Sequence, residues 1–558
     1  MKLGGWGSSK ISLSLSDYPG VLTYLTQHFS VTHLKSFEEF SPEDFSLSPP
    51  EREEELKEIL KTSSLTYSCE SLIRLRYGLG KSYPELLSFF SPKKVAIGTL
   101  PCAVLFPKTQ EEVQQCVLLA QKHNACLVPF GGGSSVVGGL RAIRKIPHQW
   151  IWTISLEYLN RILQVDEENF QVHVEAGIFG PVLESTLQSL SFTFGHFPQS
   201  FEFSTVGGWI ATLSSGQNSI RYGGIEKRVS GLHLVTGTGE KITTSISSSP
   251  WPRQATGPDL KQLFIGSEGR FGIITQACLK ISPCPIQKTY KAFAFASWQE
   301  GLKACLALVK KKIPLALLRL SDEQETMAHL LLGKNTHHSQ SFLQDIFSKG
   351  VKQGIKLALS YKNINPQSFS LVLVGMEDLF LWEEVEEEWR KNHCSFLSLG
   401  ESVGNKWLES RFKLPYFREQ LMANDFLVDT LETACSWTQV SQLYEGMKQS
   451  LTQSLNNFYT LSHPQIWVHF SHFYEEGVSL YFTIVAKQHP DFPYEQWAKM
   501  KEAANNFLKQ QKAPASHHHA IGLDHKNAQN IFPWQQETLE QIAHLYDPQG
   551  LLNPEKLL

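Results

Sequence analysis

The sequence lacks the features of several common protein classes. Its 558 residues contain no run of 18 or more apolar residues, so no transmembrane helix is expected. The start, "MKLGGWGSSK", has no secretion-signal pattern. The net charge of only −3 supplies no bulk attraction for nucleic acid. None of the nine cysteines forms a CxxC pair, which favours reduced thiols in a cytoplasmic protein; peripheral contact with a membrane stays open.

Common nucleotide and metal motifs are also missing. No GK[ST] follows a glycine loop, and Val136 stands where the last glycine of a Rossmann GxGxxG would be. No HExxH or Cys/His spacing indicates zinc. These absences argue against a P-loop enzyme, a nicotinamide enzyme and a zinc enzyme.

Three loops rich in small residues are present instead, within one stretch of strand-like sequence. They are "PFGGGSSVVGGL" near 131, "EFSTVGGWIATLSSGQ" near 207 and "IGSEGRFGIIT" near 269. Glycine allows positive φ and lets backbone amides approach an anion, and serine adds hydroxyl donors. Tight turns would need similar residues, but three such loops together favour a long ligand held at several points.

The pattern of apolar residues predicts an α+β protein with several parts. Residues 1–94 are expected to be mostly helical, and 95–285 alternate short strands with helices, including a Thr-capped helix in "TQEEVQQCVLLAQKHN". Residues 286–514 repeat strand–helix units on an antiparallel sheet. Residues 515–558 are expected to return to the first domain.

In their order, the three loops resemble those of the vanillyl-alcohol oxidase/PCMH family of FAD-dependent enzymes. The resemblance implies a two-part PCMH-type FAD-binding domain and an α+β cap. It also implies non-covalent FAD, since "VPFGGGSSV" has no His or Cys to carry the tether found in many relatives. The implied cofactor-binding residues are Pro129, Gly131, Gly132, Gly133, Ser134, Ser135, Val136, Gly138, Pro198, Ser200, Ser204, Thr205, Gly208, Thr212, Ser214, Ser215, Gly266, Ser267, Glu268, Gly269, Gly272 and Ile274.

Within that family the chain is similar to the alkyldihydroxyacetonephosphate synthases, through "GHFPQSFEFSTVGGW", "TGPD", "LLRLSD", "ETACSW" and "SHHHAIG". The likeness implies an ether-lipid enzyme that exchanges the acyl group of 1-acyl-dihydroxyacetone phosphate for a long-chain fatty alcohol. Flavin N5 would hold C1 of the substrate, with no net oxidation. A homodimer is one assembly that the sequence leaves open.

Three candidate residues come from the second half of the chain. The resemblance makes Tyr481 the acid/base tyrosine and Arg418 the arginine that binds the substrate phosphate, a role that suits a bidentate guanidinium. Arg319 lies among leucines, where a charge must be paired or face a site. Without the resemblance, a core tyrosine and a surface arginine would be the simpler interpretations of the first two.

The triplet His517, His518 and His519 raises the question of a metal. Adjacent side chains of a strand point to opposite faces, so three neighbours rarely bind one ion, and no metal is expected. The resemblance places the triplet in an active-site loop at the flavin edge, where imidazoles exchange protons near neutral pH. Structural histidines are the plainer alternative.

The sequence departs from the synthases beside these motifs. Ala520 stands for a glycine, Leu523–Asp524 stand where the synthases have a basic residue, and Arg270–Phe271 stand for Thr-Leu. Two other functions therefore stay open: an FAD-dependent 2-hydroxyacid dehydrogenase of the D-lactate/glycolate type, and a flavoprotein or lipid-binding module without catalysis. The dehydrogenases carry a Glu-His-Gly version of the loop, unlike "SHHHAIG".

Overall fold

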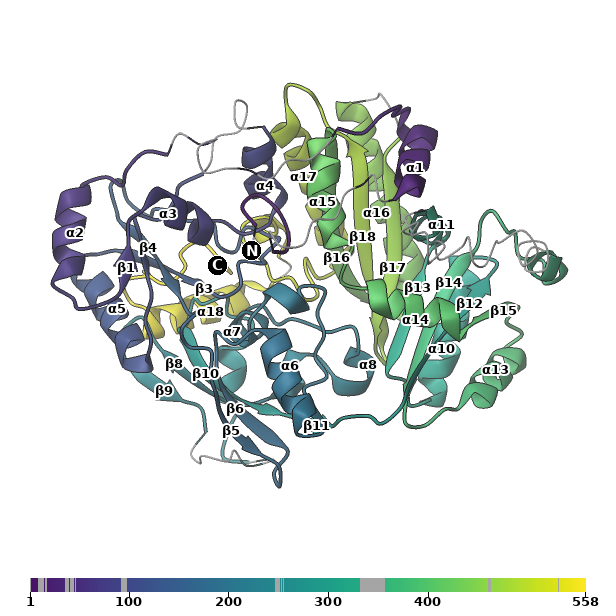
Figure 1. The fold of residues 1–558 in the computed structure, drawn as a ribbon, viewed down its shortest axis with the longest axis horizontal. Coiled ribbons are helices and arrows are strands. Elements are labelled where there is room, and N and C mark those ends of the chain that lie inside the picture. Colours follow the sequence, from purple (N-terminus) through teal and green to yellow (C-terminus); the bar gives the residue numbers. More distant parts are fainter. Residues whose placement is uncertain are drawn as a thin grey trace.

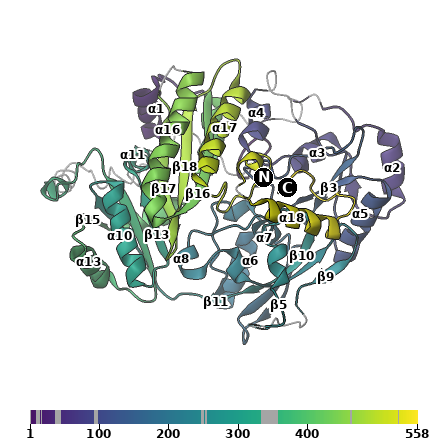
Figure 2. The same cartoon turned by 180° about the vertical axis from the view of Figure 1, so that it is seen from behind.

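A computed structural model of the chain shows two lobes of mixed helix and sheet side by side, with both termini beside the first lobe (Figure 1; Figure 2 gives the view from behind). The predicted α+β class is confirmed. Among the described residues no helix is both long and apolar enough to cross a bilayer. The structure describes residues 2–8, 15, 18–35, 40, 45, 47–91, 98–245, 251, 253, 255–331, 357–459, 463–529 and 531–557.

The first lobe begins with a four-stranded sheet in the order β1-β2-β4-β3. β2, β4 and β3 run parallel, and β1 joins antiparallel to β2. Thr109 caps α5 by accepting the N–H of Glu112, as the sequence predicted. The elements are β1 (Tyr67–Ser68), β2 (Ala103–Leu105), β3 (Cys126–Phe130), β4 (Ile151–Ser155), α2 (Glu53–Lys61), α3 (Ser71–Gly78), α4 (Tyr83–Phe90) and α5 (Gln110–Lys122).

A second, antiparallel sheet completes this lobe in the order β5-β6-β10-β8-β9, and β7 pairs with β11 beside it. Its buried faces share one core with the first sheet. The elements are β5 (Ile162–Asp166), β6 (Gln171–Glu175), β7 (Phe192–Thr193), β8 (Val229–Val235), β9 (Lys241–Thr243), β10 (Ile273–Lys280), β11 (Ser282–Pro283), α6 (Gly180–Ser189), α7 (Val206–Ala211), α8 (Ser219–Tyr222) and α9 (Ile225–Arg228).

The second lobe is built on a seven-stranded antiparallel sheet in the order β15-β12-β14-β13-β17-β18-β16. Helices α10, α13, α16 and α17 share a buried core with this sheet. The elements are β12 (Lys288–Phe295), β13 (Leu317–Ser321), β14 (Ser370–Glu377), β15 (Phe396–Gly400), β16 (Phe426–Ser436), β17 (Gln465–Phe473), β18 (Gly477–Lys487), α10 (Trp298–Lys311), α11 (Glu323–Leu331), α13 (Trp382–Lys391), α14 (Glu401–Ser410), α15 (Pro415–Ala423), α16 (Val440–Phe458) and α17 (Pro493–Gln511).

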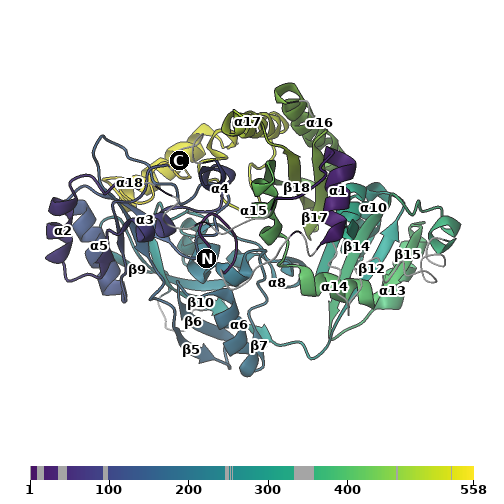
Figure 3. The ribbon, with the colours of Figure 1, turned by 45° about the horizontal axis from the view of Figure 1, so that its top comes forward.

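Both chain ends cross between the lobes. Near the N-terminus, α1 (Pro19–Phe29) packs on the cap with Phe417, Phe426 and Trp467, as Figure 3 shows from above. After the cap, the chain returns to the first lobe through the histidine loop and α18 (Pro533–Tyr546). There Leu552 pairs with Leu127 of β3. The loop after β3 and residues of β16, β17 and β18 therefore line one cavity.

Candidate functional site

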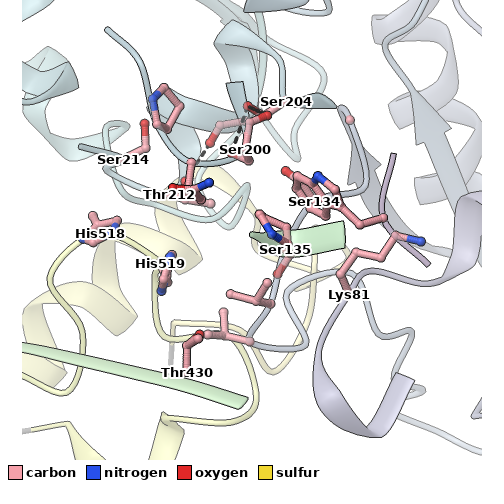
Figure 4. Close-up of a pocket in the computed structure, with 18 of the residues that line it drawn as sticks. Lys81, Ser134, Ser135, Ser200, Ser204, Thr212, Ser214, Thr430, His518 and His519 are labelled. Carbon is pink, nitrogen blue, oxygen red and sulfur yellow. Dashed lines mark hydrogen bonds between the residues drawn. The ribbon is translucent and has the colours of Figure 1, made fainter. Parts of the chain in front are cut away.

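A cavity of about 400 Å³ lies between the lobes, within the usual range for a cofactor pocket. Figure 4 shows Ser134, Thr212 and Ser214 on one side of it and His518 and His519 on the other. Of the predicted cofactor-binding residues, Gly138, Gly266 and Ser267 are not in its wall. The others line it: Pro129, Gly131, Gly132, Gly133, Ser134, Ser135, Val136, Pro198, Ser200, Ser204, Thr205, Gly208, Thr212, Ser214, Ser215, Glu268, Gly269, Gly272 and Ile274.

The first glycine loop follows β3 and is packed too closely for side chains. A Cβ on Gly132 would lie 2.0 Å from the carbonyl oxygen of Phe203, and one on Gly131 would lie 2.3 Å from Oγ1 of Thr205. Gly133 has φ +71°, which favours glycine. The bare backbone amides and the hydroxyls of Ser134 and Ser135 form a cradle that fits the pyrophosphate of FAD.

The "GSEG" segment supports the histidine loop as well as the cavity wall. Both carboxylate oxygens of Glu268 accept backbone N–H groups, from Ile521 and Gly522, at 2.9 Å each. Burial raises the pKa of Glu268, and those two hydrogen bonds oppose the rise. Ser267 turns away and donates to the carbonyl of Phe264. This loop therefore links the cofactor cradle directly to residues 521–522.

The departure at Arg270 lies between two glycines that line the cavity, Gly269 and Gly272, but its own side chain does not face the cavity. Its side chain is buried outside the cavity wall, where it pairs with Asp547 and donates to the carbonyl of Leu552. Leu523 and Asp524 also lie outside the wall, and their N–H groups donate to the carbonyl of Val137. Ala520 is the departure that does line the cavity, and its φ of +70° is the strained conformation expected where relatives have glycine.

The histidine loop is organised by one buried carboxylate, Glu432 of β16. Its Oε1 accepts the backbone N–H groups of His517 at 3.2 Å and of His518 and His519 at 2.8 Å each. It also accepts the hydroxyl of Ser516 at 2.8 Å. Nδ1 of His518 lies 2.5 Å from the other oxygen, Oε2. Glu432 was not among the residues predicted from the sequence; it lies in "ETACSW", a segment that contributed only to the family resemblance.

The triplet is a turn rather than the strand on which its side-chain directions were predicted. His518 and His519 line the cavity, whereas His517 lies behind them. Burial lowers the pKa of His517 and of His519 to about 4, so both are neutral at pH 7. Burial alone would raise the pKa of Glu432, but His518 and His519 beside it hold that pKa well below its usual range.

A fourth histidine, missed in the sequence, joins the triplet from β17. His472 sits at a β-bulge with φ +53°, and its ring stacks on that of His517 with centroids 4.9 Å apart. Ligand atoms of His472, His517 and His518 lie within 4.8 Å of one another, as do those of Glu432, His518 and His519. The fold therefore brings His472 and Glu432, which lie far away in the sequence, next to the triplet.

Tyr481 lies directly opposite Glu432 in the pairing of β18 with β16. It lines the cavity, with its ring centroid 5.7 Å from that of His519 and 6.3 Å from that of His518. On the other side His469 stacks on it at 4.7 Å. Burial raises the pKa of Tyr481, so the phenol is protonated at neutral pH.

Both predicted arginines line the cavity, and both are paired with buried acids. Arg319 donates to Glu325 at 3.0 Å, and Nδ1 of His469 lies 2.8 Å from the same oxygen. Arg418 donates to Asp429 at 3.0 Å and to the carbonyls of Val428 and Lys81. A guanidinium has five N–H groups, so Arg418 keeps two that these bonds do not use.

Beyond these polar groups the cavity continues into an apolar arm under α1. An apolar lining of this kind suits a hydrocarbon chain, because burial of apolar surface against it is favourable. The arm contains Leu15, Val21, Leu25, Leu421, Trp467 and Val485.

Comparisons with known proteins agree with this geometry. The "FAD binding domain" family model matches residues 101–245, and "FAD linked oxidases, C-terminal domain" matches residues 285–557. The chain therefore has both an FAD-binding domain and the C-terminal domain of the FAD-linked oxidases. This flavoprotein is 29% identical to alkyldihydroxyacetonephosphate synthase of Trypanosoma brucei brucei, over 90% of this chain and 80% of the relative. It is 28% identical to that of Dictyostelium discoideum, over 100% and 93%.

A solved structure of alkyldihydroxyacetonephosphate synthase superimposes on this flavoprotein with a TM-score of 0.82. The identity is 25%, and the match covers 100% of this chain and 98% of the other. The cofactor is FAD, as predicted, and the cradle after β3 fits it.

We predict that Gly132→Ala abolishes FAD binding, because its Cβ would collide with the main chain at Phe203. The measurement is flavin absorbance per mole of purified protein. Gly98→Ala is the matched control, since no atom lies within 4 Å of a Cβ there. A Gly132→Ala protein with a full complement of FAD would contradict the cradle.

Asp524 generates a prediction about pH. Burial raises its pKa to about 7, opposed by Lys501, so the folded state holds a proton that the unfolded chain loses near pH 4. The contribution of Asp524 to stability should therefore fall as pH rises from about 4 to 7. Asp524→Asn should therefore stabilise the protein by about 1–3 kcal/mol at pH 8 and by little at pH 4.

Denaturant unfolding of the wild type and Asp524→Asn across this pH range measures the difference. Asp425→Asn, at a side chain that is 63% exposed, should leave the profile unchanged. Parallel profiles for wild type and Asp524→Asn would show that Asp524 is charged in the folded protein throughout.

Proposed function

We propose that this flavoprotein is an alkyldihydroxyacetonephosphate synthase, which exchanges the acyl group of 1-acyl-dihydroxyacetone phosphate for a long-chain fatty alcohol. The observation that carries the proposal is the joining of three features in one cavity: the FAD cradle, the histidine loop with Tyr481, and the apolar arm under α1. When bound, FAD supplies an electrophilic ring that activates the ketone substrate without net oxidation.

The cavity supplies acid and base groups for both halves of the exchange. Tyr481 is protonated, and its ring centroid lies 6.3 Å from that of His518 and 5.7 Å from that of His519. A phenol and an imidazole in this arrangement hold or accept a proton as the carboxylate leaves and the alcohol attacks. We propose that Tyr481, His518 and His519 act as these acid and base groups, and that His517 supports them from outside the cavity wall.

Arg418 and Arg319 are proposed to orient the anionic end of the substrate. The two N–H groups that Arg418 keeps suit a phosphate oxygen, and its bonds to Asp429 and two carbonyls fix the guanidinium before substrate arrives. Arg319, held by Glu325, places a second positive charge in the same cavity. Non-covalent attachment of FAD follows from the glycine loop, where no histidine or cysteine stands.

The acyl substrate and the alcohol are amphipathic, so we also propose that the enzyme takes them from a membrane surface. The apolar arm under α1 is the feature that such lipids would enter. A cytoplasmic location and a homodimer stay predictions from the sequence.

Purified protein should be yellow, should release its FAD on acid treatment, and should release fatty acid when given palmitoyl-dihydroxyacetone phosphate and a fatty alcohol. Tyr481→Phe and His518→Ala should each lower that rate by about 10²–10⁴-fold while keeping FAD. Arg418→Ala should raise the apparent KM. Tyr158→Phe, at a side chain that is 48% exposed, is the control.

Bleaching of the flavin by D-lactate, with no fatty acid released, would replace the synthase by the 2-hydroxyacid dehydrogenase. Full turnover in both Tyr481→Phe and His518→Ala would remove the proposed acid/base groups. An unchanged KM in Arg418→Ala would place the phosphate elsewhere.

A further inference from the structure

The proposed exchange releases a proton inside a buried cavity, and this inference rests on that function. The alcohol loses its O–H bond as its oxygen forms the ether bond to C1. The ester C1–O bond breaks, and the carboxylate leaves with the electron pair. A carboxyl group with an ordinary pKa of about 4 to 5 leaves as an anion at pH 7, so one proton per turnover must reach solvent.

A line of hydrogen-bonding groups connects the cavity with the surface. His518 lines the cavity, and its Nδ1 lies 2.9 Å from Nδ1 of His517. Nε2 of His517 lies 2.7 Å from the hydroxyl of Tyr474. Neither His517 nor Tyr474 is in the cavity wall, and Tyr474 is 36% exposed. The three side chains therefore lead from the reacting groups to water.

Both nitrogens of His517 are used along this line, one toward each neighbour. A neutral imidazole accepts a proton on one nitrogen and releases the proton carried by the other, which moves charge without moving the ring. Burial lowers the pKa of His517 to about 4, so a proton does not stay on it. His517 is therefore suited to pass a proton on and not to hold it.

Its surroundings fix the His517 ring in this orientation. His472 stacks on it nearly parallel, with 19° between the planes. Nδ1 of His472 is itself held by the hydroxyls of Ser219 at 2.7 Å and Ser215 at 3.1 Å. The N–H of His517 is held by Glu432. The bulge at His472 therefore turns its ring toward His517, on which it stacks.

We propose that His517 and Tyr474 form the exit by which the proton of the incoming alcohol passes from His518 to solvent. His517 and Tyr474 are positioning and relay residues, whereas His518, His519 and Tyr481 line the cavity. Nδ1 of His518 also faces Oε2 of Glu432 at 2.5 Å, and because the pKa of Glu432 lies well below its usual range this carboxylate attracts the proton without keeping it.

The test uses the full-length flavoprotein and the variant Tyr474→Phe, which keeps the ring and removes the hydroxyl. We expect kcat for fatty-acid release to fall by about tenfold, less than for loss of an acid/base group because water partly replaces the hydroxyl. The solvent deuterium isotope effect should rise, and added imidazole buffer should restore kcat. KM and FAD content should not change. Tyr494→Phe, at a tyrosine that is 38% exposed, is the matched control.

His517→Gln is the second variant, since an amide occupies the place but does not pass a proton. It should show the same isotope effect and the same rescue. Wild-type kinetics in Tyr474→Phe, or a loss of rate in both variants without a larger isotope effect and without buffer rescue, would overturn the exit.

One readout does not depend on turnover. In protein labelled with ¹⁵N-histidine, the signals of His517 should shift in Tyr474→Phe and not in Tyr494→Phe. Absence of exchange in the wild type would remove the proposed function, and this measurement would still decide the relay contact: unchanged His517 signals would overturn it.

Discussion

The site depends on the carboxylate of Glu432. A turn of three histidines has backbone N–H groups that point to one side, and in a buried position they need an acceptor. Glu432 accepts all three and holds the ring of His518 as well. Because β16 pairs with β18, the same residue lies opposite Tyr481. One side chain thus sets the distance between the tyrosine and the histidines.

The charge on Glu432 also sets the electrostatics of the cavity. It is buried without a Lys or Arg partner among the described residues, and the imidazoles around it are its only cationic candidates. Burial keeps His517 and His519 neutral. The negative charge of Glu432 attracts a proton to these imidazoles, but their low pKa means that they release it again. On the opposite wall Glu268 holds residues 521 and 522 by the same means. Two buried carboxylates, one from each lobe, therefore clamp the loop between the cofactor and the cap.

Features that depend on a few neighbouring residues could be predicted from the sequence. The Thr109 cap and the glycine loop after β3 follow from short-range rules, and the structure has both of them. Glu432 and His472 come from strands whose register is decided by tertiary pairing, and His472 reaches the site only because of a bulge. The pairing of Arg270 with Asp547, 277 residues away, could not be predicted from the sequence for the same reason. Long-range partners of this kind have no signature in a single sequence.

The most direct test of this account is the rate of alcohol-for-acyl exchange by the Glu432→Gln flavoprotein. Glutamine keeps an acceptor oxygen for the loop but removes the charge and introduces an N–H₂ group beside His518. The account predicts a protein that retains FAD and loses exchange by about 10²-fold or more. Exchange at the wild-type rate in Glu432→Gln with its FAD bound would contradict the claim that this carboxylate organises the site.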